Sequence, residues 1–294
     1  LVTQMVYEFP ELQGIIGSYY ADHSGEDPEV CLAIKEHYRP AFSGDDPPSN
    51  QLGSIISIAD KLDTILGCIG VGLLPSGSED PYGLRRHSLG IIQIVLNRKW
   101  QFSLGKLIEK GISLLEEKIK LAPDEVRMHT LDLFSQRYKT LLSDQDYPYD
   151  AVDAVLSADI DSLVDVKQKV IAFSDLKKQP HFEPLAIAFR RVISILNEEV
   201  DGDIKISLLK EPAEKKLYDE YLRVKKPVEN CLSKKQFPQA LEKIVEIKET
   251  VDEFFEHVMV MTKEDALRKN RLRLLKHISS LFSNIADFSK IVLK

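Results

Sequence analysis

Lysine and arginine gather near the carboxyl end of an otherwise acidic chain. Between residues 263 and 276 six cations stand against two acidic residues, a local net charge of +4, whereas the whole chain carries −7. The cations are Lys263, Arg268, Lys269, Arg271, Arg273 and Lys276. Cations gathered on one helix can neutralise nucleic-acid phosphates and release their counterions. A solvated helix surface is the structural alternative.

A helical projection sorts these cations into two groups. Steps of three, four and seven residues put five aliphatic residues on one face: Leu267, Leu274, Ile278, Leu281 and Ile285. On the opposite, solvent-facing side are Lys269, Arg273 and Lys276, where they could contact phosphates. Arg271 falls on the leucine face and Arg268 at its edge. Each therefore either pairs with an internal carboxylate or lines a cleft that admits RNA.

Two further features fit an RNA-binding surface. Asn270 carries a donor and an acceptor, so it could hydrogen-bond the edge of an unstacked base. Arg190 and Arg191 form a second basic cluster in the same part of the chain. Residues 182–294 hold 21 Lys and Arg against 19 Asp and Glu, a net of +2, and residues 1–181 hold 18 against 27, a net of −9. The carboxyl-terminal part is therefore the part expected to approach a nucleic acid.

His37, Asp60 and Asp63 are of the types that ligate metal in phosphohydrolases. Such an enzyme needs an adjacent His-Asp doublet and further ligands, and the sequence contains no such doublet. A polar helix edge that hydrogen-bonds its neighbours is the alternative. No phosphate-binding glycine motif, nucleophile elbow or catalytic cysteine signature occurs either. The sequence thus predicts no catalytic residue and no metal site.

Arg85 and Arg86 open a predicted helix, where the helix dipole disfavours cations. They are expected either to meet an external anion or to pair with Glu79 or Asp80. The chain lacks an apolar run of about 18 residues and a signal-peptide pattern, so no membrane association is expected. Three widely spaced cysteines without a CxxC motif suit a reducing compartment. The abrupt start without methionine suggests a piece of a longer chain.

Helical periodicity dominates and strand alternation is almost absent, so an all-α fold with short loops is expected. A Lys pair, two prolines and the shift in charge place a domain boundary near residues 175–180. Helices are predicted over residues 29–39, 52–66, 84–96, 104–119, 123–142, 160–172, 185–198, 213–221, 241–255 and 264–288.

Several long segments resemble the β subunit, or β region, of bacterial-type heterotetrameric glycyl-tRNA synthetases. They are EFPELQGIIG (8–17), EHYRPAFSGDDPPSN (36–50), IADKLDTILGCIGVGLLPSGSEDPYGLRRHSLGI (58–91), RRVISIL (190–196), LLKEPAE (208–214) and FFEHVMVMTKEDALRKNRLRLLKHISSLFSNIADFSKI (254–291). The resemblance covers essentially the whole chain, as the carboxyl-terminal part of that subunit. Asp265-Ala266-Leu267-Arg268 stands where such anticodon-binding domains carry their DALR-like signature.

The resemblance implies three domains. Residues 1–100 would form a degenerate, amino-terminally truncated HD-like helical domain with His37, Asp60 and Asp63 as relics of its metal pattern. Residues 101–178 would form a helical linker domain, and residues 179–294 the α-helical anticodon-binding domain.

The implied function is recognition of tRNA-Gly, by anticodon and backbone, in support of ATP-dependent glycylation catalysed by an α subunit. ATP and Mg²⁺ would be used by that α subunit, with no cofactor in this chain, in the cytoplasm or in an organelle of a eukaryote. The implied tRNA-binding residues are Arg190, Arg191, Arg268, Lys269, Asn270, Arg271, Arg273 and Lys276, with Arg85 and Arg86 either tRNA-binding or structural. Two alternatives stay open: an active HD-type metal phosphohydrolase fused to a helical module, and a helical scaffold that binds only protein.

Overall fold

The computed structural model describes residues 4–42, 44–76, 79–196 and 198–293. Over these residues the chain forms α-helices and short 3₁₀ turns, without a β-strand, which confirms the all-α prediction. None of the helices in the described ranges is long and apolar enough to cross a membrane.

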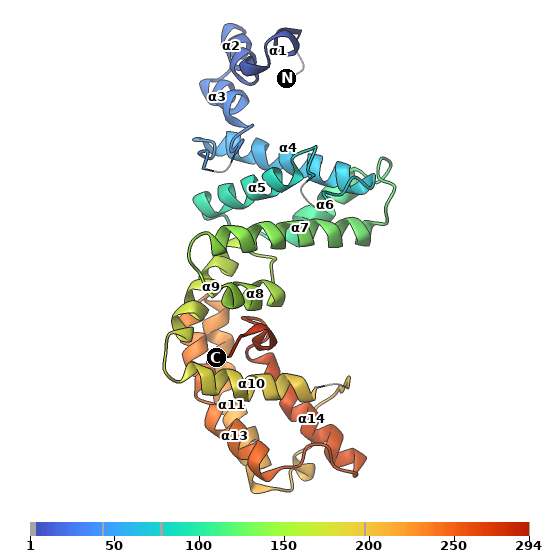
Figure 1. Ribbon diagram of the computed structural model, residues 1–294, viewed down its shortest axis with the longest axis vertical. Coiled ribbons are helices and arrows are strands. Elements are labelled where there is room, and N and C mark those ends of the chain that lie inside the picture. The colour runs from blue at the N-terminus through green and yellow to red at the C-terminus, as the bar shows by residue number, and fades with distance from the viewer. Residues whose placement is uncertain (1–3, 43, 77–78, 197, 294) are drawn as a thin grey trace. The chain divides into compact units, whose positions relative to one another are not determined.

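The described residues form fourteen α-helices joined mostly by short loops (Figure 1). They are α1 (Gln4–Glu8), α2 (Ile15–His23), α3 (Pro28–Glu36), α4 (Gln51–Gly70), α5 (Leu84–Arg98), α6 (Leu104–Leu114), α7 (Pro123–Ser143), α8 (Tyr149–Ala158), α9 (Leu163–Lys177), α10 (Phe182–Ile195), α11 (Pro212–Ser233), α12 (Phe237–Val245), α13 (Lys248–His257) and α14 (Asp265–Ser280). Three 3₁₀ turns accompany them: η1 (Pro10–Leu12), η2 (Ile206–Leu208) and η3 (Phe288–Lys290).

The chain divides into two compact units. Unit 1 comprises residues 1–141 and 161–164, and unit 2 comprises residues 142–160 and 165–294. Neither border coincides with the expected boundaries at residues 100 and 178, so the division into three domains stays a prediction.

Helix α4 organises unit 1, because α3, α5 and α6 all pack against it. Its buried stripe, Leu62, Ile65, Leu66 and Ile69, meets Ile91 and Ile92 of α5 in the core. Asp161 secures the start of α6: its backbone carbonyl accepts from the Leu104 amide at 2.8 Å and its carboxylate from the Gly105 amide at 2.8 Å.

Five buried phenylalanines form the centre of unit 2. They are Phe173 on α9, Phe182 and Phe189 on α10, and Phe282 and Phe288 after α14. Phe189 and Phe282 stack with ring centroids 4.3 Å apart, and Phe288 meets the other four edge-on or stacked. Figure 1 shows α10, α11, α13 and α14, coloured yellow to red, grouped beside this core. The cluster fixes α10 against α14, the two helices that carry most of the predicted RNA-binding residues.

Several predicted helix boundaries in unit 2 were wrong, and three of them differ most from the structure. The helix expected over 264–288 ends at Ser280, after which tight turns let Leu281, Phe282 and Ile285 all stay buried. The helix expected over 241–255 is two helices, α12 and α13, separated around the buried Ile247. Helix α11 continues past Pro227, which is tolerated because the buried stripe carries on to Val228.

Candidate nucleic-acid interface

Arg271, on the leucine face of α14, is buried and paired inside unit 2. It is 6% exposed, and its Nε donates to Oε1 of Glu214 at 2.6 Å. Its Nη1 donates to the backbone carbonyl of Met259 at 3.0 Å. Oε2 of the fully buried Glu214 accepts the backbone amides of Lys210 and Glu211 at 2.6 and 2.7 Å, at the start of α11. The internal salt bridge, one of the two alternatives for Arg271, therefore describes its geometry.

The Arg271 contact fixes the segment 258–261, which precedes α14. Val258 and Val260 are buried, whereas Met259 and Met261 are 76% and 50% exposed. The period-two pattern VMVM was the available signal, because alternate residues of an extended segment point to opposite sides. Two apolar side chains thus face solvent just before α14 begins.

Asn270 is also engaged within the fold. Its side chain is buried, its Oδ1 accepts from the Lys205 amide at 2.8 Å, and its Nδ2 donates to the Lys205 carbonyl at 3.1 Å. Both polar groups of the amide are therefore used to hold the chain before η2. A base contact by Asn270 stays a prediction, and it would require this clamp to open.

The side of α14 expected to face solvent is partly covered by residues 198–205, an acidic segment after α10. Arg268 pairs with Glu198 and, at 2.8 Å, with Asp265. Arg273 Nε donates to the Asp201 carbonyl at 2.7 Å. Lys276 Nζ donates to the Val200 carbonyl at 2.9 Å and to Asp201 Oδ1 at 2.8 Å. A helical projection cannot reveal such a cover, because the covering residues lie about 70 positions away in the sequence.

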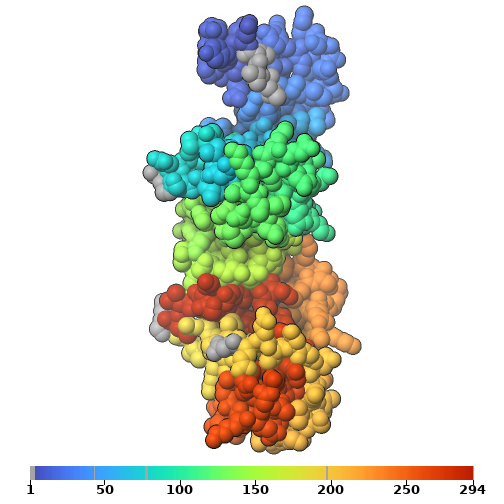
Figure 2. All heavy atoms as spheres, turned by 90° about the vertical axis from the view of Figure 1, so that its right-hand side faces the viewer, coloured from blue at the N-terminus to red at the C-terminus, as the bar shows by residue number. Residues whose placement is uncertain are grey.

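These contacts shift the pKa values of the groups that take part in them. The hydrogen bond from Lys276 and its positive charge hold the pKa of Asp201 below its ordinary value. Hydrogen bonds to Asp265 and Glu198 raise the pKa of Arg268. Figure 2 looks onto the face where the yellow segment that includes residue 200 adjoins the orange-red start of α14. This face presents cations that already have anionic or carbonyl partners.

An open cavity of about 410 Å³ lies beside these contacts. Its lining includes Arg273, Lys276, His277, Asp201 and Asp203. Burial, together with the charges of Lys225 and Lys276, lowers the pKa of His277, so its imidazole is neutral near pH 7. The cavity is therefore bordered by two cations and two carboxylates.

Three other predicted contact cations of unit 2 do not pair with the acidic segment after α10. The Lys269 side chain is 46% exposed and pairs with Asp265 at 2.8 Å within the same helix. Arg191 lies over the Phe255 ring, with its guanidinium carbon 4.3 Å from the ring centroid. Its neighbour Arg190 is exposed and forms no ion pair with the residues that the structure describes. These three side chains can meet a ligand without leaving an acidic partner on another segment.

In unit 1 the residues expected as relics of a metal site do not converge. His37 is buried, and its Nδ1 is 2.9 Å from the Ile34 carbonyl of its own helix. Asp60 and Asp63 are exposed on α4. Among the described residues no group of three His, Cys, Asp or Glu side chains could hold a metal ion. This geometry gives no support to the alternative of an active phosphohydrolase.

Lys61, between those two aspartates, points inward instead. It is 2% exposed, and its ammonium donates to the carbonyls of His37, Tyr38 and Arg39 at 3.1–3.3 Å and to Ser57 Oγ at 2.8 Å. Burial lowers its pKa to about 8. Gly90 of α5 leaves room for it, since a Cβ there would lie 3.0 Å from Lys61 Cε. Sequence reasoning missed Lys61 because a lysine within an amphipathic helix is usually solvated.

Arg85 and Arg86 form no ion pair with Glu79 or Asp80 within the described residues. Asp80 instead caps α5, since its two carboxylate oxygens accept the amides of Leu84 and Arg85 at 2.8 and 3.0 Å. This carboxylate supplies the negative charge that a helix start favours, which offsets the two arginines. Their role as RNA contacts stays a prediction.

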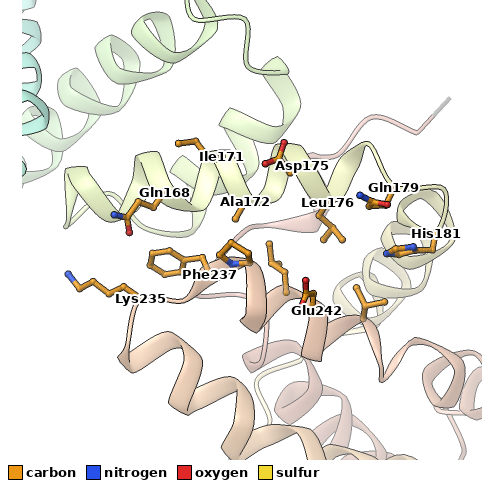
Figure 3. A pocket seen from close by; sticks show the side chains of 13 residues that line it. Gln168, Ile171, Ala172, Asp175, Leu176, Gln179, His181, Lys235, Phe237 and Glu242 are labelled. Atoms are coloured by element: carbon orange, nitrogen blue, oxygen red, sulfur yellow. The ribbon is translucent and has the colours of Figure 1, made fainter.

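A groove of about 750 Å³ lies between α9 and α12 of unit 2 (Figure 3). Ala172 and Leu176 of α9 point toward Phe237 of α12 across it, and Ile171 and Leu241 also line it. Its one bordering lysine, Lys235, is already paired with Asp165 at 3.0 Å. The groove therefore lacks the unpaired positive charge of an RNA site.

Comparisons with known proteins agree with this arrangement. Residues 1–157 match the sequence profile described as glycyl-tRNA synthetase beta subunit, and residues 185–291 match that described as DALR anticodon binding domain. The second match contains most of α10, all of α11 to α14, and all the predicted RNA-binding cations of unit 2.

Relatives of known name extend over nearly the whole chain. The glycine–tRNA ligase beta subunit of Syntrophus aciditrophicus is 46% identical over 292 residues, and that of Geotalea daltonii is 44% identical over 291. Each alignment covers 99% of this chain and 42% of the relative, so the chain spans less than half the length of these proteins. On these matches, the chain belongs to the glycyl-tRNA synthetase beta subunit family.

Proposed function

We propose that this chain binds tRNA-Gly as the tRNA-recognition part of a glycine–tRNA ligase. The observation that carries the proposal is the match of residues 185–291 to an anticodon-binding domain, on a unit whose surface presents Arg190, Arg191 and Lys269. RNA-binding domains of this kind hold backbone phosphates with cations and read unstacked bases with polar and apolar side chains.

The predicted contact residues take two roles in this proposal. Arg190, Arg191 and Lys269 contact phosphates directly, because their side chains are exposed and none of them pairs with the acidic segment after α10. Arg271 and Asn270 position the recognition surface, through Glu214 and Lys205. Removal of a positioning residue should therefore lower stability more than affinity.

Catalysis is assigned elsewhere in the proposal. Glycine, ATP and Mg²⁺ bind the partner α subunit, and this chain holds the tRNA so that the activated glycine reaches its 3′ end. The setting is the cytoplasm. Arg85 and Arg86 of unit 1 are exposed enough to form a separate contact with the same tRNA.

Binding of labelled tRNA-Gly, measured at two salt concentrations, tests the proposal. The expected result is saturable binding that weakens with salt, with a slope of log Kd set by the number of phosphates neutralised. A tRNA-Gly transcript with an altered anticodon, otherwise identical, should bind more weakly. Equal affinity for both transcripts would remove anticodon recognition from the proposal, and no binding of either would leave the protein-scaffold alternative.

A further inference from the structure

The acidic segment after α10 places carboxylates where an RNA-binding helix would receive phosphates. Glu198 forms an ion pair with Arg268 and Asp201 forms one with Lys276, although both cations belong to the predicted contact surface. Carboxylate and phosphate oxygens are alternative acceptors for the same charge-assisted hydrogen bonds. The two carboxylates therefore mark two positions on α14 that are suited to anionic oxygens.

The two acidic side chains can leave without unfolding the segment. The Asp201 side chain is 89% exposed and that of Glu198 is 39% exposed, so each can turn into solvent. The backbone between them stays anchored, because Val200 is buried and Lys205 is held by Asn270. Surface ion pairs of this kind contribute little to stability. Exchange of a carboxylate for a phosphate should therefore require only side-chain rotation.

Access to the second position is open in the structure. The cavity of about 410 Å³ beside Lys276 is bordered by Arg273 and by Asp201 itself. A phosphate that enters there meets Lys276 directly and Arg273, whose Nε is held by the Asp201 carbonyl at 2.7 Å. His277, neutral near pH 7, adds no charge of its own.

We propose that Arg268 and Lys276 form two RNA-phosphate positions that Glu198 and Asp201 occupy in the free protein, and that tRNA binding exchanges each carboxylate for a phosphate. The inference rests on the proposed function and adds a mechanism to it. The internal carboxylates compete with the RNA, so they set both its affinity and its salt dependence. A carboxylate displaced by a phosphate is left unpaired beside the RNA and takes up a counterion, so the exchange releases fewer counterions overall than a direct phosphate contact.

Three single substitutions in the full-length protein test this exchange. Glu198→Gln and Asp201→Asn each remove one competing charge with little change of shape. Glu199→Gln is the matched control: it lies in the same segment, makes the same change in net charge, and is exposed without an ion pair to the described residues. Affinity for tRNA-Gly and its salt slope are measured for each variant, with the melting temperature as a check on folding.

The expected result separates the test variants from the control. Glu198→Gln and Asp201→Asn should each tighten tRNA binding about threefold or more and steepen the salt slope by up to about 0.9, because no displaced carboxylate is left to take up a counterion. Glu199→Gln should change affinity less than about twofold, because it only alters the general field. All three should keep the melting temperature of the parent.

Other outcomes overturn the exchange. Equal effects of all three substitutions would mean that the carboxylates do not compete with RNA, and weaker binding by the two test variants would mean that they support the site. Gains seen for a polyglutamate peptide, and not for tRNA, would assign the two positions to an acidic protein. If the parent protein binds no tRNA, the proposed function fails first. If the parent binds and the variants match the control, only the exchange fails.

Discussion

Unit 1 and unit 2 each bury a cationic side chain, and the two side chains differ in the groups that accept their hydrogen bonds. Lys61 of unit 1 is surrounded by neutral acceptors, three backbone carbonyls and a hydroxyl. Arg271 of unit 2 faces the buried carboxylate of Glu214. Arg268 and Lys276, on the surface of the same helix, face exposed carboxylates instead. We therefore expect a cation with a buried partner to stabilise the fold, and a cation with an exposed partner to be available to a ligand.

This difference ranks the consequences of removing each cation. Loss of Arg271 leaves a buried carboxylate without a cation, and loss of Lys61 leaves buried neutral acceptors without a donor. Loss of a surface cation leaves no buried group without a partner. The expected effects on stability fall in that order, whereas the effects on RNA binding should run in the opposite direction.

Arg271→Met should have the largest effect on stability. It leaves the fully buried Glu214 without its cation and frees the Met259 carbonyl, a loss of about 3–5 kcal/mol in the free energy of unfolding. Denaturant unfolding measures it, and Lys269→Met on the same helix is the control, expected to unfold like the parent. The tRNA affinity of the folded fraction should stay unchanged. Lower affinity at unchanged stability would instead place Arg271 in the RNA site.

Lys61→Met should come next, with a loss of about 1–3 kcal/mol, because the carbonyls of residues 37–39 lose their donor. The loss is smaller than for Arg271→Met because the groups left without a donor are neutral carbonyls rather than a buried carboxylate. Lys35→Met, on an exposed position of α3, is the control. Equal stability of the two variants would mean that the Lys61 ammonium is dispensable, and the comparison between the units would then fail.

The same variant has a pH signature. Burial lowers the pKa of Lys61 to about 8, below the value of about 10.4 for an unfolded lysine. Between these values the unfolded chain binds more protons than the folded chain, so the contribution of Lys61 to stability rises with pH. The parent should therefore gain stability relative to Lys61→Met as pH increases from about 8 to 10. A constant difference between parent and variant across that range would contradict the lowered pKa.

The sequence predicted the fold better than the site, for a physical reason. The burial of Leu274 and Ile278 follows from periodicity, because a helix face is a local property. The partners of Arg268 and Asn270 come from residues 198–205, far along the chain, so no local pattern indicates them. Glu214 could have been suspected, since Glu211 and Glu214 have the spacing of a capping box around Pro212. The burial of Lys61 could not have been predicted, because it depends on the close approach of Gly90 of α5 to the Lys61 side chain.

Lys269→Ala tests the other half of the comparison, a cation that is exposed on the surface of unit 2. Its side chain is 46% exposed, so stability should hardly change, whereas tRNA affinity should fall about two- to fivefold and the salt slope should flatten by roughly one. The loss should be the same for transcripts with native and altered anticodons, because phosphate contacts carry no sequence information. Lys226→Ala, an exposed position on α11, is the control. A loss confined to the native anticodon would make Lys269 a base-reading residue.

The smallest expected effect is that of divalent metal on unit 1. His37 is turned to the Ile34 carbonyl, Asp60 and Asp63 are exposed, and the Lys61 ammonium repels a cation from the segment 37–39. Neither Mn²⁺ nor a chelator should therefore shift the melting temperature of the protein. The test is sensitive, because a metal present at a hundred times its Kd would stabilise the folded state by about 2.7 kcal/mol. A rise with Mn²⁺ that His37→Ala abolishes would show that these residues still converge on a metal, and Lys61 would then not be the cation that this part of the fold requires.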